Sequence, residues 1–274
     1  MKSWSINKRT KLFLLTAFAW TWVGWIAAYF ISNLRGSILS VDYTVFSLWT
    51  ESWGTDRFFP QLLFALAVYG PFIGFLVVGG FGGLVKRKNN APQLWHYVIL
   101  IPVISVIPPI ILSIATSYFN PNAQLMVIVT SIILYFISNL ITSGTEEFGW
   151  RGVLYPEMKS TGMSFWDIAW KGGIIWAVWH YPLMFIMYMP LGLAVLLPTL
   201  VGFTASIVAM NYITNFLYEK TQNIWAAVVL HALNNTMSFI LVLLFPETPF
   251  LILTSLMAWV IVGWLEKKYP KMLA

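Results

Sequence analysis

Eight runs of mostly apolar residues, each close to or above the length of a membrane-spanning helix, divide this chain. An α-helix needs about 20 apolar residues to cross the hydrocarbon core of a bilayer, because each residue advances it by about 1.5 Å. The runs cover residues 11–32, 60–84, 94–118, 124–155, 168–188, 191–217, 224–245 and 248–265. This pattern predicts an all-α, polytopic membrane protein with eight transmembrane helices in a single domain, residues 1–274.

The composition excludes other classes of protein. Of the 274 residues, 59% are hydrophobic and 9% are charged, whereas about 25% are charged in an ordinary soluble domain. A soluble globular enzyme and a disordered chain are therefore excluded. The chain has no Cys, which also excludes a thiolate metal site, an iron–sulfur cluster and a cysteine nucleophile.

The basic residues predict the orientation of the chain in the membrane. Of the 16 Lys and Arg residues, Arg35 and Arg57 fall on one side of the predicted spans and Arg151 falls inside a span. The other 13 fall on the opposite side: Lys2, Lys8, Arg9, Lys11, Lys86, Arg87, Lys88, Lys159, Lys171, Lys220, Lys267, Lys268 and Lys271. Because basic loops stay in the cytoplasm, both termini are predicted to be cytoplasmic. The net charge of +6 then reflects contact with anionic membrane lipids, and no nucleic-acid partner is expected.

Two stretches depart from the simple span pattern. The run 124–155 is longer than a bilayer requires, so it must tilt, emerge from the membrane or kink near Gly144, Gly149 or Gly152. The connection 33–59 is the longest between runs, and its many aromatic residues predict an interfacial segment that lies on the bilayer.

Polar side chains inside three of the runs fall in one layer. Residues 145–151 and the single positions His180, His231 and Asn235 supply them. Counted from the predicted cytoplasmic ends, His180 is about 13 Å deep and His231 about 12 Å. Asn235 is about 18 Å deep and Glu146 about 20 Å. Because ionisable groups inside a membrane are costly, this agreement predicts a shared polar cavity that opens toward the cytoplasm.

Spacing within the fourth run separates its two carboxylates. Glu147 and Arg151 are four residues apart and lie on one helix face, where they can form a supporting ion pair. Glu146 is about 100° round the helix from Glu147 and keeps a carboxylate that is not committed to the arginine. Glu146 is therefore the candidate general base for a water molecule.

The other two polar clusters complete a hydrolytic site. His231 and Asn235 are also four residues apart, and both can donate hydrogen bonds to a developing oxyanion. His180 can share the water with Glu146 or orient it. Together these groups suffice for hydrolysis by activated water without a cofactor or a covalent intermediate.

Three motifs in order carry a resemblance to a known family. They are Glu146-Glu147-x-x-x-Arg151, Trp176-x-x-x-His180 and His231-x-x-x-Asn235. This arrangement, within residues 140–240, resembles the CPBP family of intramembrane proteases, which includes the type II CAAX prenyl endopeptidases. In the second motif, Trp176 stands where the family often has Phe, a change that preserves bulk.

The resemblance implies an intramembrane glutamate-type endopeptidase that hydrolyses a peptide bond of a membrane-associated substrate. It implies that the catalytic residues are Glu146, His180, His231 and Asn235 and that the supporting residues are Glu147 and Arg151. In eukaryotic members the substrate is a prenylated CAAX-type protein at the endoplasmic reticulum. Prokaryotic members lie in the cell membrane and are associated with bacteriocin processing or immunity.

Two other classes of function remain open at the level of sequence. Two His and one Glu could form a three-ligand zinc site, which would make the chain a zinc-dependent membrane hydrolase. A layer of Glu, His and Arg side chains also suits a proton relay, as in a non-catalytic membrane immunity or transport protein.

Overall fold

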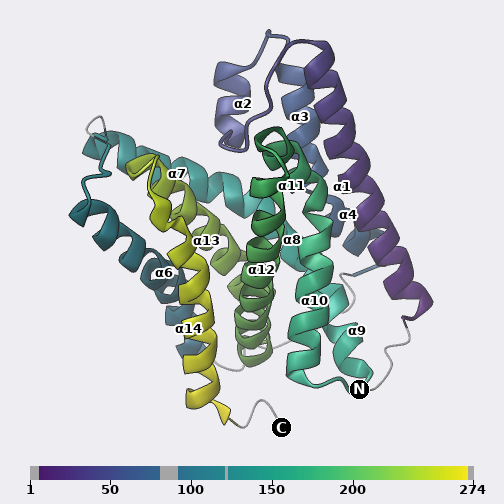
Figure 1. Cartoon of the computed structure of the whole chain (residues 1–274). Helices are drawn as coiled ribbons and strands as arrows, with labels where there is room; N and C mark the ends of the chain where they lie inside the picture. Colours follow the sequence, from purple (N-terminus) through teal and green to yellow (C-terminus); the bar gives the residue numbers. More distant parts are fainter. Residues whose placement is uncertain (1–5, 81–91, 121–122, 271–274) are drawn as a thin grey trace.

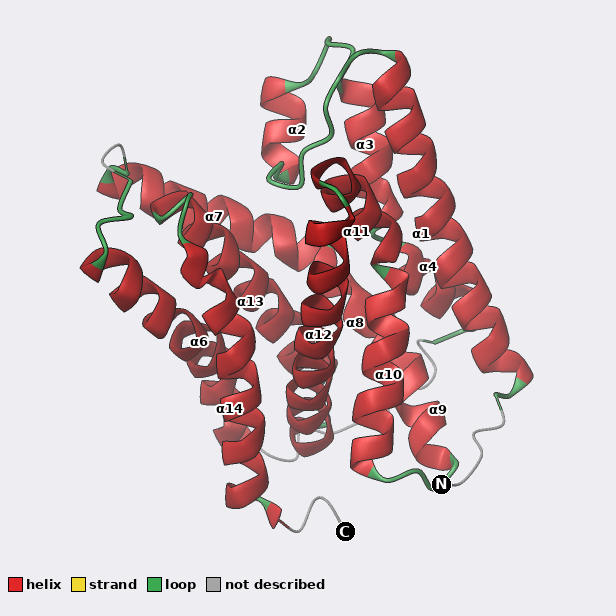
Figure 2. Ribbon diagram, in the orientation of Figure 1, coloured by secondary structure: helices red, strands yellow, loops and turns green. Residues whose placement is uncertain are grey.

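The computed structural model describes residues 6–80, 92–120 and 123–270, and every regular element in these ranges is helical (Figures 1 and 2). The all-α prediction is confirmed. The α-helices are α1 (Lys8–Leu34), α2 (Val45–Glu51), α3 (Phe58–Ala67), α4 (Gly70–Val77), α6 (Trp95–Ala115), α7 (Leu125–Ile141), α8 (Glu146–Gly149), α9 (Tyr155–Ser160), α10 (Phe165–Trp179), α11 (Tyr181–Tyr188), α12 (Leu193–Thr221), α13 (Ile224–Leu244) and α14 (Ile252–Lys268). The end of the predicted run 60–84 and the basic residues Lys2, Lys271 and 86–88 lie outside the described residues.

Six helical segments are long and apolar enough to cross a membrane, and two bent pairs raise the number to as many as eight. The pairs are α3 with α4, bent by 52°, and α10 with the segment Tyr181–Leu191, bent by 49°. Pro71 and Pro182 are the second residues of α4 and α11, the second helix of each pair. Because proline has no N–H to donate, it is tolerated in the first turn of a helix but breaks a continuous one. The predicted runs thus fall on six long segments and two bent pairs of helices.

The long fourth run is broken where it carries its charged residues. Helix α7 ends at Ile141, a 3₁₀ turn covers Ser143–Thr145, and a π-helix covers Trp150–Leu154 between α8 and α9. A Cβ on Gly144 would lie 3.2 Å from the carbonyl oxygen of Val228, and one on Gly149 would lie 2.6 Å from that of Pro71. Of the alternatives expected for this run (a tilt, a kink or an emergence from the membrane), the structure shows changes of helix type beside Gly144 and Gly149, and these two glycines let the segment approach α13 and α4 closely.

The helices form a bundle around α12, which packs against α10, α13 and α14. Helices α3 and α4 pack against α1 on one flank, and α6 and α7 pack against α13 on the other (Figure 1). The end of α1, helix α2 and the start of α3 lie at the upper end of the molecule in Figure 1. The start of α1, helix α9 and the end of α14 lie toward the opposite end.

Candidate active site

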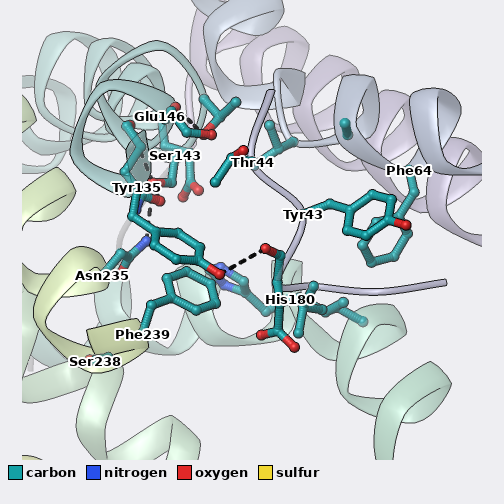
Figure 3. A pocket seen from close by; sticks show the side chains of 18 of the residues that line it. Tyr43, Thr44, Phe64, Tyr135, Ser143, Glu146, His180, Asn235, Ser238 and Phe239 are labelled. Atoms are coloured by element: carbon teal, nitrogen blue, oxygen red, sulfur yellow. Dashed lines mark hydrogen bonds between the residues drawn. The ribbon is translucent and has the colours of Figure 1, made fainter. Parts of the chain in front are cut away.

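A pocket of about 620 Å³ lies among α3, α7, α11, α12, α13 and the segment 40–45. The four predicted catalytic residues, Glu146, His180, His231 and Asn235, all line it. Figure 3 labels three of them, Glu146, His180 and Asn235. Glu146 and Asn235, which are 89 positions apart in the sequence, therefore line the same pocket. The fully buried Glu147 and Arg151 lie next to this group, since Glu147 contacts His231.

Two tryptophans hold one oxygen of the Glu146 carboxylate. The indole Nε1 of Trp176 donates to Glu146 Oε2 at 2.9 Å, and that of Trp150 donates to the same oxygen at 3.3 Å. Glu146 is 1% exposed and begins α8 directly after the 3₁₀ turn. In the described part of the chain no hydrogen bond reaches Oε1, so this second oxygen is available to a water molecule in the pocket.

The backbone around His180 fixes which ring nitrogen carries a proton. Its Nδ1 lies 2.9 Å from the carbonyl oxygen of Trp176, where α10 ends and the backbone N–H of His180 bonds to Ala177 instead. A carbonyl oxygen only accepts hydrogen bonds, so Nδ1 carries the proton. In the neutral imidazole Nε2 then has a free lone pair, which can accept a proton from water.

His231 has a different partner and a different chemistry. Its Nδ1 lies 2.8 Å from Oε1 of Glu147, and Oε2 of Glu147 lies 2.9 Å from Nη1 of Arg151. Arg151 also donates from Nη2 to Asn211 Oδ1 at 2.9 Å. The predicted ion pair is present, and the structure adds that Glu147 bridges Arg151 to His231. The Glu147 carboxylate can accept a hydrogen bond from Nδ1 of either the neutral or the protonated ring, and in the protonated form Nε2 is also a donor.

A chain of polar side chains holds Asn235. Its Nδ2 donates to Ser143 Oγ at 3.0 Å, and Ser143 donates to Asn139 Oδ1 at 3.1 Å. Asn139 Nδ2 in turn donates to Thr236 Oγ1 at 3.3 Å. The Asn235 amide has a second N–H for the pocket. Sequence reasoning missed Asn139 and Ser143, although two polar residues four apart in an apolar run are a signal of this kind.

Trp176 contacts Glu146, His180, His231 and Arg151. Besides its hydrogen bonds to Glu146 and His180, its ring packs edge-to-face with the ring of His231, with the centroids 5.4 Å apart. The guanidinium carbon of Arg151 lies 4.6 Å from the centroid of the indole. The sequence predicted only that Trp176 preserves the bulk of a Phe. The structure adds an N–H donor that Phe lacks.

We expect Trp176→Phe to lower kcat by about 10- to 100-fold with little change in KM, because it removes the N–H donated to Glu146 and keeps the ring. A hydrogen bond to a charged group contributes about 1.5–3 kcal/mol, and 1.36 kcal/mol is tenfold in rate. Trp150→Phe is the matched variant, and its longer bond predicts a smaller effect. An unchanged kcat for Trp176→Phe would show that only the ring matters.

We expect Ser143→Ala to lower kcat about fivefold, because the Asn235 amide loses the partner that orients it, and one hydrogen bond contributes about 1 kcal/mol. Steady-state kinetics on the purified variant measures the effect. Ser206→Ala is the control, since that hydroxyl bonds to Ser255 between α12 and α14, away from the pocket. Equal rates for Ser143→Ala and the wild type would contradict a positioning role for Ser143.

The side chains do not fit the zinc alternative. Among the residues described by the structure, no group of three or more His, Asp or Glu side chains is arranged to hold a metal ion. A catalytic zinc site with three protein ligands therefore has no counterpart in this arrangement.

Comparison with protein families identifies the part of the chain that carries the site. The model of the family described as type II CAAX prenyl endopeptidase Rce1-like matches residues 128–237. This range runs from α7 into α13 and includes all three motifs. Comparison with curated proteins gives no match. The resemblance noted in the sequence is confirmed: residues 128–237 form an Rce1-like domain of the type II CAAX prenyl endopeptidase (CPBP) family.

Proposed function

We propose that the chain is an intramembrane endopeptidase that hydrolyses a peptide bond of a membrane-associated protein with water activated by Glu146 and His180. The observation that carries the proposal is that four polar side chains line one pocket. Glu146 brings a carboxylate oxygen and His180 an imidazole lone pair, and His231 and Asn235 bring N–H donors. The family match supports a protease, and its CAAX description makes a lipidated peptide the first substrate to test.

The chemistry follows from the hydrogen bonds. Water held between Glu146 Oε1 and His180 Nε2 attacks the carbonyl carbon of the scissile bond and gives its proton to one of these two groups. His231 Nε2–H and the second N–H of Asn235 face the oxyanion that forms. The C–N bond then breaks, the leaving nitrogen takes the proton, and the products are a carboxylate and an amine.

The rest of the pocket suits an apolar ligand. Its walls include Phe64, Leu183, Met187, Phe203 and Ile207. Binding sites for small apolar groups are typically lined in this way, with a few polar groups at the reacting end. The lining therefore supports a substrate that brings a lipid chain or an apolar segment to the site.

The test uses two peptides of identical sequence, one lipidated and one not, incubated with the purified protein in lipid. Mass spectrometry of the products is expected to show one cleavage position, with the lipidated peptide cleaved faster. The double variant Glu146→Ala, His180→Ala is the control and is expected to leave both peptides intact. Equal cleavage by that variant would remove these residues from the mechanism.

A further inference from the structure

The pocket extends from the candidate catalytic residues toward one end of the molecule. Before Glu146 it is lined by Tyr135, Ser138 and Asn139 on the second half of α7 and by Thr142 directly after that helix. After His180 it is lined by Leu183, Met184 and Met187, and on α13 it continues past His231 as far as Val242. Neighbouring helices run in opposite directions along the bundle. The residues that line the pocket on each of them therefore lie toward one end of the molecule, the end that holds α2 (Figure 1).

At that end the pocket is lined by residues 40–45, here called the rim segment, which hydrogen bonds hold in place. The side-chain amide of Gln61 bonds both to the backbone N–H of Ser40, at 3.0 Å, and to its carbonyl, at 2.7 Å. Tyr135 donates its hydroxyl proton to the carbonyl of Asp42 at 3.0 Å, and the backbone N–H of Val45 donates to Ser138 at 3.0 Å. Figure 3 shows Tyr43 and Thr44 of this segment across the pocket from Asn235.

The basic residues gather at the other end. In the described ranges they lie at the start of α1, on α9, near the start of α10 and at the ends of α12 and α14: Lys8, Arg9, Lys11, Lys159, Lys171, Lys220, Lys267 and Lys268. Only Arg35 and Arg57 flank the rim segment in those ranges. Basic residues mark the cytoplasmic side of a membrane protein. The rim segment is therefore on the non-cytoplasmic side.

We infer that the pocket opens to the non-cytoplasmic face of the membrane and receives its substrate there. This direction is opposite to the one predicted from the sequence. The depths of Glu146 and His180 measure their distance from the basic end of the helices but carry no information about which way the space around them opens. The substrate part of the inference rests on the proposed hydrolysis.

The inference narrows the substrate class. A polypeptide that is anchored in the membrane and exposes its cleavage segment outside the cytoplasm would reach the pocket past the rim segment. A protein lipidated near its C-terminus and held on the cytoplasmic leaflet would meet the basic end, away from the mouth of the pocket.

The absence of Cys from the chain makes single cysteines clean reporters of exposure. Asp42→Cys places one in the rim segment, at an exposed position that lines the pocket. Asp56→Cys places one at the same end outside the pocket, where the side chain of Asp56 is 84% exposed. Lys267→Cys places one at the exposed basic end.

Cells expressing each full-length variant are treated with a membrane-impermeant maleimide before and after permeabilisation. The Asp42→Cys and Asp56→Cys proteins are expected to be labelled in intact cells, and the Lys267→Cys protein only after permeabilisation. The reverse pattern would overturn the inference. So would labelling of Asp56→Cys but not of Asp42→Cys in intact cells, because the pocket would then be closed to that face.

A bulky maleimide tests the substrate route. Added to intact cells, it is expected to block cleavage of a membrane-anchored reporter by the Asp42→Cys protein and to leave cleavage by the Asp56→Cys protein unchanged. Continued cleavage by fully labelled Asp42→Cys protein would overturn entry past the rim segment. Labelling does not depend on catalysis. If the labelling is as expected but no variant cleaves the reporter, the proposed hydrolysis is refuted and the direction of opening stands. If the reporter is cleaved but the labelling pattern is reversed, the direction of opening is refuted and the proposed hydrolysis stands.

Discussion

Glu146→Gln is expected to lower kcat by about 10²- to 10⁴-fold, the usual contribution of a general base. The amide has nearly the shape of the carboxylate, and its oxygen can still accept the indole N–H groups of Trp150 and Trp176. It cannot take a proton from water, however. The loss should therefore appear in kcat, with KM and the unfolding temperature close to those of the wild type.

Glu157→Gln is a matched control for this substitution. Glu157 pairs with Arg9 at the molecular surface, with 15% of its side chain exposed, and it does not line the pocket. The control should cleave the lipidated peptide at the wild-type rate. A Glu146→Gln protein that folds and still turns over within tenfold of the wild type would contradict the role of Glu146 as base.

Glu147→Ala is expected to cost about 3–5 kcal/mol of unfolding free energy, the typical loss when one partner of a buried ion pair is removed. Glu147 and Arg151 are both fully buried, and the guanidinium would keep only its hydrogen bond to Asn211. His231 would lose its Nδ1 partner as well. Denaturant-induced unfolding in detergent, followed by circular dichroism, measures the change.

The control for Glu147→Ala is a substitution in the surface ion pair of Arg9 and Glu157. The side chain of Arg9 is 43% exposed, and such pairs contribute about 0–1 kcal/mol. Arg9→Ala should therefore leave the unfolding free energy nearly unchanged. If Glu147→Ala were no more destabilising than Arg9→Ala, the buried bridge from Arg151 to His231 would not stabilise the fold.

Hydropathy predicted the location of the helices but not their internal breaks. The eight apolar runs correspond to the six long segments and two bent pairs because burial in lipid imposes the same composition on every span. The bends before Pro71 and Pro182 were missed, since both prolines lie inside apolar runs. For the fourth run a tilt, a kink or an emergence from the membrane was predicted from its excess length, and the structure shows changes of helix type where it carries its charged residues and glycines.

Residue spacing predicted the groups within one helix better than the contacts between helices. The ion pair of Glu147 and Arg151 was predicted because residues four apart lie on one face of a helix. The bridge from Glu147 to His231 and the indole bonds to Glu146 join different helices, so they depend on packing that no single run reveals. The rim segment was likewise assigned to a connection outside the membrane, and its position against the pocket required the folded structure.

The central claim is that Glu146 and His180 act on one water molecule. A kinetic cycle of Glu146→Gln, His180→Ala and the double variant tests it, with kcat measured on the same lipidated peptide. Residues that act as a unit are non-additive. The double variant is therefore predicted to be no slower than the slower single variant. A rate loss in the double variant equal to the product of the two single losses would show that the two side chains act independently and would contradict a shared water.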